Sequence, residues 1–322
     1  MAKRLIDCTV SEMSGFTKAD KISSIAGCEG RVMACECIGF VTPMLGNITN
    51  AEFVSSLGAD IILLNIFDVD KPVILGLPEV APEDTIREIK RLTGRIIGIN
   101  LEPVPENFAS ENNTNLWKIS EGRKATVANA IKARDMGVDL ILLTGNPGNG
   151  VNNDAICATL KEFKKAIGDD VILAAGKMHA SEVLSEGGEN IITKNDVRRF
   201  AEAGADVILY PAPGTVPGIT MEYIRDLVQE THKLGCLAMS SIGTSQEGAD
   251  VETIRRIALM CKMAGIDIHH IGDSGFTGTA VPEDITAYSV TIRGVRHTYR
   301  RMARSEERRV GKECRSRWSP YH

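Results

Sequence analysis

The stretch AGADVILYPA (203–212) shows the pattern that decides the fold: a glycine, an aspartate two residues later, and then an apolar run. The same arrangement recurs at LGADIILLN (57–65), MGVDLILLT (136–144) and AGIDIHHIG (264–272). A glycine at such a point ends a helix in a left-handed turn, and the aspartate then opens a strand. The repeat therefore predicts that helices and strands alternate along the chain.

Working outward from these four junctions, the chain contains eight near-continuous apolar runs, as expected for parallel strands that are covered on both faces. They are 31–39, 60–67, 95–102, 138–145, 171–177, 206–212, 236–241 and 266–272. Amphipathic helical patterns lie between them, at 84–92, 122–137, 155–168, 220–235 and 251–265. Eight such units predict a single (β/α)8 TIM barrel. The alternative is an open doubly wound sheet, which would typically carry a G-x-G-x-x-G turn after its first strand, and the sequence has none there.

The ends of the chain are expected to lie outside the barrel, which we assign to 31–303. Residues 1–30 precede the first strand, and KADKISSIAG (18–27) predicts an extra helix that caps the N-terminal end of the barrel. The segment 304–322, RSEERRVGKECRSRWSPYH, resembles the translation of a sequencing adapter, and we expect it to be non-native. A basic arm for nucleic acid is the alternative interpretation of this tail.

Composition narrows the class of protein. Hydrophobic residues make up 43% of the chain and charged residues 25%, with a formal net charge of −5, which is ordinary for a globular domain. Aromatic residues are only 5%, which argues against a stacking surface for nucleic acid. No apolar run approaches the roughly 18 residues of a membrane span, and the first residues lack the apolar core of a signal peptide. We therefore expect a cytoplasmic protein that binds neither nucleic acid nor membrane.

The eight cysteines have no spacing that indicates a disulfide framework. Cys35 and Cys37 form a C-x-C on a predicted strand, so both thiols should point to one face. We interpret them as reduced packing residues, with metal binding as the alternative.

Carboxylates are expected near the C-terminal ends of two strands, where the active sites of these barrels lie. Glu36 should point into the barrel, because a charged side chain does not suit the packed helix layer. Asn100 and Glu102 share one face of their strand. Glu36 and Glu102 are therefore candidate catalytic residues, either as metal ligands that share Mg²⁺ with Asn100 or as a general acid and base.

Lys177 and His179 form a K-x-H at the end of the fifth predicted strand, with the same parity as Ala175. Lys177 is a candidate to neutralise an enolate or to form a Schiff base, and a salt bridge is the alternative. His179 is a candidate proton shuttle near neutral pH.

Four further polar residues at strand ends are candidate substrate-binding groups. They are Asn65, Asn146, Tyr210 and His270. His269 and His270 are neighbours on one strand, so only one of the two can enter the cavity.

Two loops have the composition of an anion site, SSIGTSQEGAD (240–250) and IGDSGFTGTAVPED (271–284). Many barrels hold phosphate with the loops after strands seven and eight. The candidate phosphate-binding residues are Gly243, Thr244, Ser245, Gly272, Ser274 and Gly275. Plain tight turns are the alternative interpretation.

The eight-unit pattern and these two loops resemble the ribulose-phosphate-binding barrels. The chain also resembles an uncharacterised family of bacterial barrel proteins that is often labelled haloacid dehalogenase-like hydrolase and linked with sugar phosphotransferase systems. This resemblance implies a small phosphorylated metabolite. The nucleophile motif of the hydrolase label, D-x-D-x-[TV], is matched only by Asp68-Val69-Asp70-Lys71-Pro72, with Pro72 in the last position, and we interpret the match as chance.

Together these features predict an enzyme that acts on a small phosphorylated or carboxylated sugar derivative by lyase, aldolase or isomerase chemistry. A metal-dependent hydrolase or phosphatase is one alternative, and a non-catalytic regulator that binds a sugar phosphate is another. Homo-oligomerisation stays open at this stage.

Overall fold

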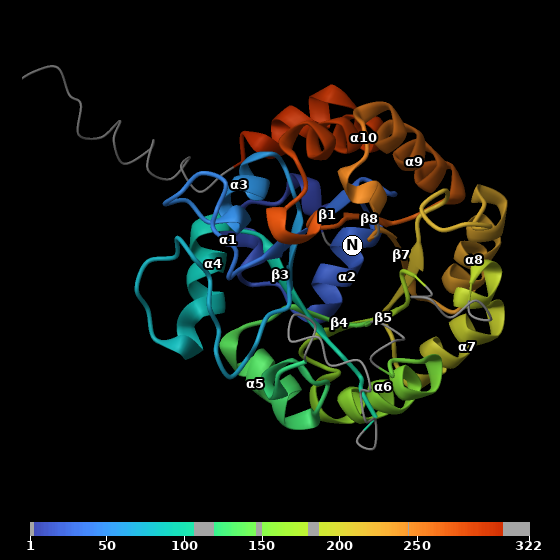
Figure 1. Cartoon of the computed structure of the whole chain (residues 1–322), viewed down its shortest axis with the longest axis horizontal. Coiled ribbons are helices and arrows are strands. Elements are labelled where there is room, and N and C mark those ends of the chain that lie inside the picture. The colour runs from blue at the N-terminus through green and yellow to red at the C-terminus, as the bar shows by residue number, and fades with distance from the viewer. Residues whose placement is uncertain (1–2, 106–118, 146–149, 180–186, 244, 305–322) are drawn as a thin grey trace, which may run out of the picture.

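The structure is a computed structural model that describes residues 3–105, 119–145, 150–179, 187–243 and 245–304. Eight parallel strands close into a barrel in the order β1 to β8, with β8 pairing back to β1, and helices surround it (Figure 1). The strands are β1 (Val32–Ile38), β2 (Ile61–Asn65), β3 (Ile96–Leu101), β4 (Leu140–Leu143), β5 (Ile172–Gly176), β6 (Val207–Pro211), β7 (Leu237–Ile242) and β8 (Ile268–Ile271). This confirms the predicted (β/α)8 fold.

The outer ring and the connections consist of α-helices and short 3₁₀ turns. The α-helices are α1 (Val10–Met13), α2 (Lys18–Ala26), α3 (Asn50–Ser56), α4 (Thr85–Thr93), α5 (Val127–Met136), α6 (Asn153–Ile167), α7 (Lys194–Ala203), α8 (Met221–Lys233), α9 (Val251–Ala264) and α10 (Pro282–Met302). The 3₁₀ turns are η1 (Leu5–Asp7), η2 (Pro82–Asp84), η3 (Glu121–Arg123), η6 (Gly188–Ile191), η7 (Ser245–Gly248) and η8 (Gly275–Thr277). None of the helices in the described ranges is both long and apolar enough to cross a bilayer.

The four glycine–aspartate junctions work as the repeat indicates. Each glycine has a φ between 91° and 109°, in the left-handed region that an L-residue with a side chain rarely adopts. Each aspartate then accepts, through Oδ2, the backbone N–H of a residue on the preceding strand, at 2.8–2.9 Å. The aspartates are Asp60, Asp139, Asp206 and Asp267. At the N-terminal end of the barrel, the repeated motif therefore links the starts of β2, β4, β6 and β8 by a hydrogen bond to the strand that precedes each of them.

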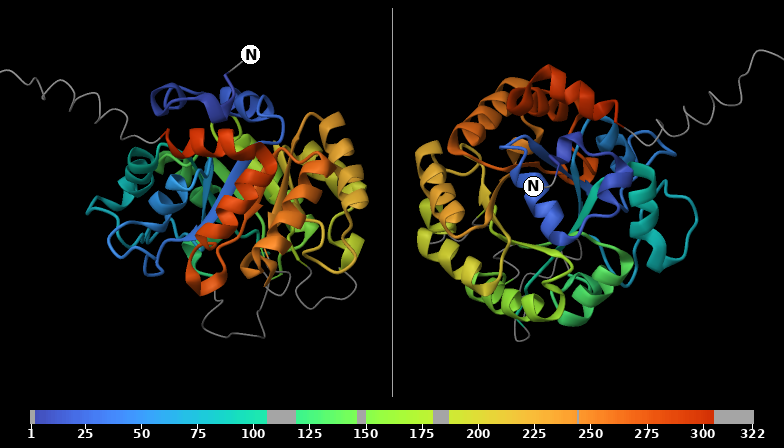
Figure 2. Two further views of the ribbon diagram at one scale, coloured as in Figure 1. Left: turned by 90° about the horizontal axis from the view of Figure 1, so that it is seen from above. Right: turned by 180° about the vertical axis from the view of Figure 1, so that it is seen from behind.

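The N-terminal segment closes this end. The helix predicted over 18–27 is α2, which crosses the opening of the barrel (Figure 2). Leu5, Ile6 and Ile25 are fully or almost fully buried, and they belong to the same apolar cluster as the inward-facing residues of the strands. The opposite, C-terminal end is left as the mouth where a site can form.

Candidate active site

Strand alternation sends one set of polar side chains into the mouth. On β1 the inner apolar cluster contains Val32 and Ala34, while Met33 and Cys35 belong to the outer layer under the helices. Glu36 therefore continues the inward set, and it is 4% exposed. The same alternation directs inward one polar residue near the end of each of four other strands: Asn65 of β2, Asn100 of β3, Ser241 of β7 and His270 of β8.

These inward side chains form a hydrogen-bonded chain. Asn100 donates from Nδ2 to Glu36 Oε1 at 2.7 Å and to Asn65 Oδ1 at 3.1 Å. Asn65 in turn donates from Nδ2 to Asp273 Oδ2 at 2.8 Å. The side-chain amides of Asn65 on β2 and Asn100 on β3 thus join two carboxylates in one network, Glu36 of β1 and Asp273 after β8.

His270 joins the other side of Glu36. Its Nε2 lies 3.3 Å from Glu36 Oε2, and its Nδ1 lies 2.6 Å from Ser241 Oγ. His270 is 1% exposed and Ser241 is fully buried, with its hydroxyl also 2.9 Å from Met178 Sδ. A serine, a histidine and a carboxylate in line can activate a nucleophile, but this serine is covered by Met178. The arrangement therefore suits proton transfer between Glu36 and His270 better than attack by Ser241.

Two further acids enter the site from the loops after β7 and β8, and the sequence analysis assigned neither. Burial and the neighbouring Glu36 carboxylate raise the pKa of Asp273 to about 6, against lowering by Asn65 and the Gly275 amide. Burial, Asp273 and Glu36 raise the pKa of Glu247 to about 8. An acid and a base with separated pKa values on either side of neutrality are the usual equipment for proton transfer.

These acids change the interpretation of the predicted phosphate loops. Gly275 donates its N–H to Asp273 Oδ1 at 2.8 Å, and Gly272 donates its N–H to the Ile242 carbonyl at 2.8 Å. The Glu247 carboxylate also accepts from the backbone of Ser274 and Gly275, and a Cβ on Gly272 would lie 1.8 Å from Glu247 Oε2. Protein oxygens therefore already occupy these donors in this conformation, and phosphate binding by Gly272, Ser274 and Gly275 stays a prediction.

The remaining residues of the predicted cradle lie in the β7 loop. Gly243 packs against Met178 and Ser241, Ser245 is exposed at the start of η7, and Thr244 lies outside the described residues. Asn146, predicted to bind substrate, also lies outside them.

Glu102 is held apart from Glu36. It follows β3 and forms an ion pair with Arg123 of η3. Burial raises its pKa, and Arg123 opposes that shift. In the part of the chain that the structure describes, no three His, Cys, Asp or Glu side chains are arranged to hold a metal ion. The predicted Mg²⁺ shared by Glu36 and Glu102 therefore finds no support there, because Arg123 already neutralises Glu102.

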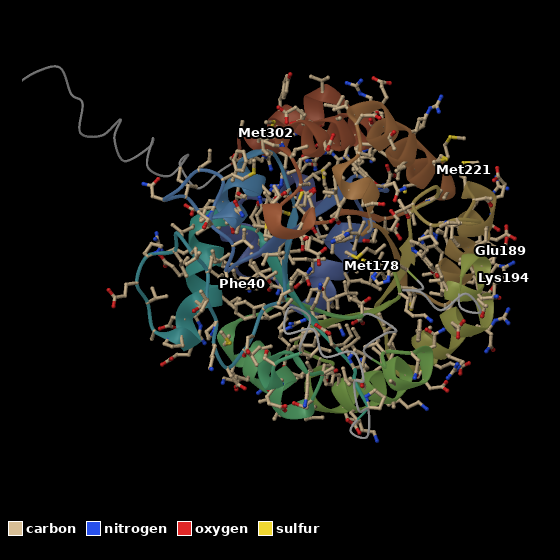
Figure 3. All side chains as sticks on the ribbon, in the orientation of Figure 1. Phe40, Met178, Glu189, Lys194, Met221 and Met302 are labelled. Atoms are coloured by element: carbon tan, nitrogen blue, oxygen red, sulfur yellow. The ribbon has the colours of Figure 1, made fainter. Side chains whose placement is uncertain are left out.

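Ala175, Lys177 and His179 were expected to share one parity facing the cavity, but on β5 this parity faces the outer layer. Ala175 belongs to the outer layer, whereas Ala174 belongs to the inner cluster and Met178 packs against that cluster. Figure 3 places Met178 near the barrel axis. Lys177, one residue beyond β5, is 2% exposed, and burial lowers the pKa of His179. Both side chains interact with neighbouring groups, so neither is an isolated polar residue.

Tyr210 was predicted at the mouth, and this placement is also wrong. Tyr210 belongs to the outer apolar layer, and its hydroxyl is hydrogen-bonded to Thr231 of α8. His269 likewise faces outward, with Nδ1 3.3 Å from Tyr288 Oη and Nε2 3.2 Å from the Gly30 carbonyl. His270 is thus the histidine of the pair that enters the barrel.

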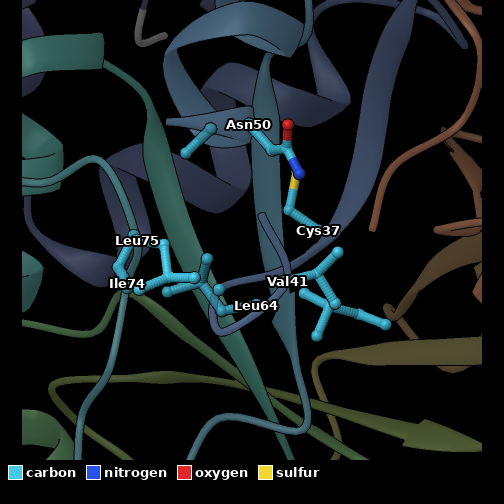
Figure 4. A pocket seen from close by; sticks show the side chains of 9 residues that line it. Cys37, Val41, Asn50, Leu64, Ile74 and Leu75 are labelled. Carbon is cyan, nitrogen blue, oxygen red and sulfur yellow. The ribbon is translucent and has the colours of Figure 1, made fainter. Parts of the chain in front are cut away.

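Other groups singled out from the sequence are packing or turn residues. Cys35 and Cys37 are buried and lie in the outer layer, where burial raises the pKa of both thiols. Cys37 lines a void of ≈ 10 Å³ between β1, β2 and α3 (Figure 4), about the space of one water at most. Asp68 caps a turn by accepting the N–H groups of Asp70 and Lys71, which agrees with a chance match to the hydrolase motif.

Three buried polar atoms at the mouth have no hydrogen-bond partner within the described residues. They are Asn100 Oδ1, Thr144 Oγ1, which lies one residue beyond β4, and His270 Nε2, which approaches Glu36 Oε2 at 3.3 Å without forming a hydrogen bond. Buried polar atoms are rarely left without a partner, so these atoms point to a ligand or ordered water at the mouth.

Comparison with known proteins gives short local matches and a shared fold. The chain is 35% identical over 89 residues to a protein of Haemophilus influenzae named "Putative N-acetylmannosamine-6-phosphate 2-epimerase". A protein of the same name from Actinobacillus pleuropneumoniae matches to the same extent. Each match covers 28% of this chain and 33% of the relative, so the similarity spans about a third of the length of these relatives.

Among solved structures, an archaeal fructose 1,6-bisphosphate aldolase superposes with a TM-score of 0.53 and 14% identity, covering 85% of this chain and 98% of the aldolase. This likeness shows the barrel fold. None of the proteins named here carries the haloacid dehalogenase-like label. The profile of one family matches residues 6–308, nearly the whole chain, and its description is "Domain of unknown function (DUF7916)". The chain therefore belongs to this family, DUF7916.

Proposed function

We propose that this protein is an enzyme that isomerises or epimerises a small phosphorylated sugar derivative by proton transfer at the C-terminal mouth of the barrel. One observation carries the proposal: a continuous buried network joins Glu36, His270 and Asp273 through Asn65 and Asn100. A network of acids and a histidine on rigid strand ends is suited to moving protons rather than to binding alone.

The roles follow from the contacts. Glu36 and His270 act as the base that removes a proton from the carbon next to a substrate carbonyl. The electron pair moves to the carbonyl oxygen, which becomes an enolate. Glu247 and Asp273, whose pKa values are raised, provide a protonated carboxyl that returns a proton to the same carbon. After the transfer, Glu36 or His270 holds the removed proton and the acid has lost one; exchange with solvent water returns both groups to their starting state, so no other reactant is needed.

The substrate class is proposed from the relatives. The two proteins matched over 89 residues are named for a 2-epimerase of an N-acetylhexosamine 6-phosphate. Such a reaction is proton removal and return at one carbon, which is what the carboxyl network can perform. A phosphoryl group at this mouth would compete with Glu247 for the Ser274 and Gly275 amides, so we expect Glu247 to be neutral or displaced when substrate binds.

The test is solvent exchange. N-acetylmannosamine 6-phosphate is incubated with the protein in D₂O, and proton NMR follows loss of the C2 proton. We expect exchange by the wild type and a loss of about 100-fold or more in Glu36→Gln, since general base catalysis contributes on that scale. Glu252→Gln, an exposed carboxylate of α9, is the matched control and should exchange at the wild-type rate.

Two results would overturn the proposal. One is the absence of exchange with this and other hexose and hexosamine phosphates. The other is an equal rate in Glu36→Gln and the wild type, with both proteins shown to be folded by circular dichroism. Tight phosphate-ester binding without any exchange would instead favour the non-catalytic regulator.

A second candidate, an aldolase or lyase, is favoured by the position of Lys177. Lys177 is buried and directly follows β5 at the C-terminal end of the barrel; this candidate requires its side chain to turn from the outer layer toward the mouth. A buried lysine can form a Schiff base with a carbonyl substrate. Borohydride reduction in the presence of dihydroxyacetone phosphate would then add a stable mass to the wild type and not to Lys177→Met, and no added mass in the wild type would reject this candidate.

A further inference from the structure

A second recess lies at the opposite end of the barrel, between the N-terminal segment, α4 and the start of β3. Its volume is ≈ 300 Å³, at the lower end of the range for small-molecule sites. Five of the residues that line it are cationic and one is acidic, Asp139. The cationic residues are Lys21, Arg87, Lys90, Arg91 and Arg95. This recess shares no residue with the mouth.

Arg95 is the most deeply buried of the cationic residues that line the recess. It is 4% exposed, and within the described residues its guanidinium donates to two carbonyls, of Ser55 at 3.1 Å and of Arg304 at 3.4 Å. Its Nε is buried without a hydrogen-bond partner, and no described carboxylate forms an ion pair with it. An almost completely buried arginine without a carboxylate is costly unless an anion completes its surroundings.

The nearby carboxylates are already shared between other cations. Lys21 and Lys90 both bind Asp139 Oδ1, at 2.6 Å and 2.8 Å, so two lysines share one carboxylate oxygen. Behind Arg95, Arg293 and Arg301 likewise share Asp60, each at 2.6 Å, and both terminal nitrogens of Arg301 lack hydrogen-bond partners. Arg87 and Arg91 are paired with Asp84 and Glu88, so the uncompensated positive charge lies at Lys21, Lys90 and Arg95 and at the arginine pair on Asp60.

The pKa shifts agree with this excess. Burial lowers the pKa of Lys90, and the nearby Lys21 lowers it further, although Asp139 raises it. Burial lowers the pKa of Arg95 well below its usual range, and Arg301 and Arg293 lower it further, although Asp60 raises it. A bound anion would favour the charged form of both side chains.

The rest of the wall is apolar. Met13 and Phe16 of the N-terminal segment and Ile96 of β3 line the recess. We propose that the recess is a binding site for a small organic anion that has an apolar part, with its anionic group held by Arg95 and Lys90 and its apolar part against Met13 and Phe16. The ligand class is that of an aromatic or acyl sulfonate, carboxylate or phosphate.

The test uses two matched probes on the full chain, because 1-anilinonaphthalene-8-sulfonate and N-phenyl-1-naphthylamine differ only in the sulfonate. We expect saturable fluorescence binding of the sulfonate at one site per chain, and binding of the neutral probe at least tenfold weaker. Lys90→Met should weaken sulfonate binding about tenfold or more, and Arg95→Met should weaken it further. Lys194→Met, which removes a lysine from an exposed pair with Asp226 on α7 and α8, should bind like the wild type.

Equal binding of the two probes, no saturable binding, or equal binding by Lys90→Met and Lys194→Met would overturn the site. If Arg95→Met does not fold, the Lys90→Met comparison still decides. The readout does not depend on catalysis, so this site can fail while the proposed activity holds, and the reverse.

Discussion

The two ends of the barrel handle acidic residues in opposite ways. At the N-terminal end each junction aspartate accepts a backbone N–H and is paired with a basic side chain, as Asp206 is with Lys18 and Asp267 with His232. At the mouth, burial and the Glu36 carboxylate raise the pKa of Asp273, and burial, Asp273 and Glu36 raise the pKa of Glu247. The first arrangement holds strands together, whereas in the second Glu247, with a pKa of about 8, carries a proton at neutral pH.

The difference teaches how to separate structural from chemical carboxylates in one fold. A carboxylate that is paired with a cation and accepts a backbone N–H is stabilised in its charged form, so it does not take up a proton near neutral pH. A carboxylate surrounded by other acids is easily protonated. The charge that lacks a partner at each end then indicates what that end binds. The clustered acids at the mouth bind protons, and the arginine-rich recess is proposed to bind an anion.

The largest effect should come from Asp60, the single carboxylate between two buried arginines. We expect Asp60→Asn to lower the free energy of unfolding by about 3–5 kcal/mol, because Arg293 and Arg301 lose their partner. Urea denaturation followed by circular dichroism measures it. Asp84→Asn is the control, since its exposed pair with Arg87 should be worth about 0–1 kcal/mol.

Adding Arg301→Met to Asp60→Asn should recover part of the loss by removing one uncompensated charge. A loss no greater than that of the control would break the comparison, because it would mean that the N-terminal end does not depend on its aspartates.

A pH dependence should distinguish the mouth. Glu247 has a pKa of about 8 in the folded protein against 4.5 for an ordinary glutamate, so its contribution to stability is present below pH 4.5 and is lost as the pH rises through 8. Glu247→Gln cannot titrate. Relative to the wild type it should gain on the order of 1–3 kcal/mol between pH 5 and pH 8.

Urea midpoints at these pH values measure the difference in slope. Glu252→Gln should keep the wild-type slope. If Glu247→Gln keeps it as well, the carboxyl is ionised at neutral pH, and the contrast between the two ends disappears.

The smallest expected change in stability concerns Tyr210, whose side chain points away from the mouth into the outer layer. Tyr210→Phe removes a hydroxyl that is bonded to Thr231 in the outer layer, so we expect about 1 kcal/mol of lost stability. The solvent-exchange rate should stay unchanged. A large loss of exchange with stability intact would show that Tyr210 acts at the mouth after all.

The sequence predicted correctly that a charged side chain on β1 and an amide side chain on β3 point into the barrel. Glu36 and Asn100 were expected to face inward, and they do, because a charged or amide group has few partners under the helices. The same reasoning did not hold for Tyr210, whose single hydroxyl is satisfied by Thr231, or for Ala175, which is small and apolar enough for either layer. Side chains with weak preferences need the register of the neighbouring strands.

By itself the sequence determined the eightfold alternation and the four junctions, since both depend on local periodicity and on glycine and aspartate at set positions. Only the tertiary structure decided that Glu247 and Asp273 meet Glu36, that Arg123 takes Glu102, and that Arg95 is buried without a carboxylate. These contacts join segments that are far apart in the chain, so they depend on barrel closure, which brings the loops after β7 and β8 against β1.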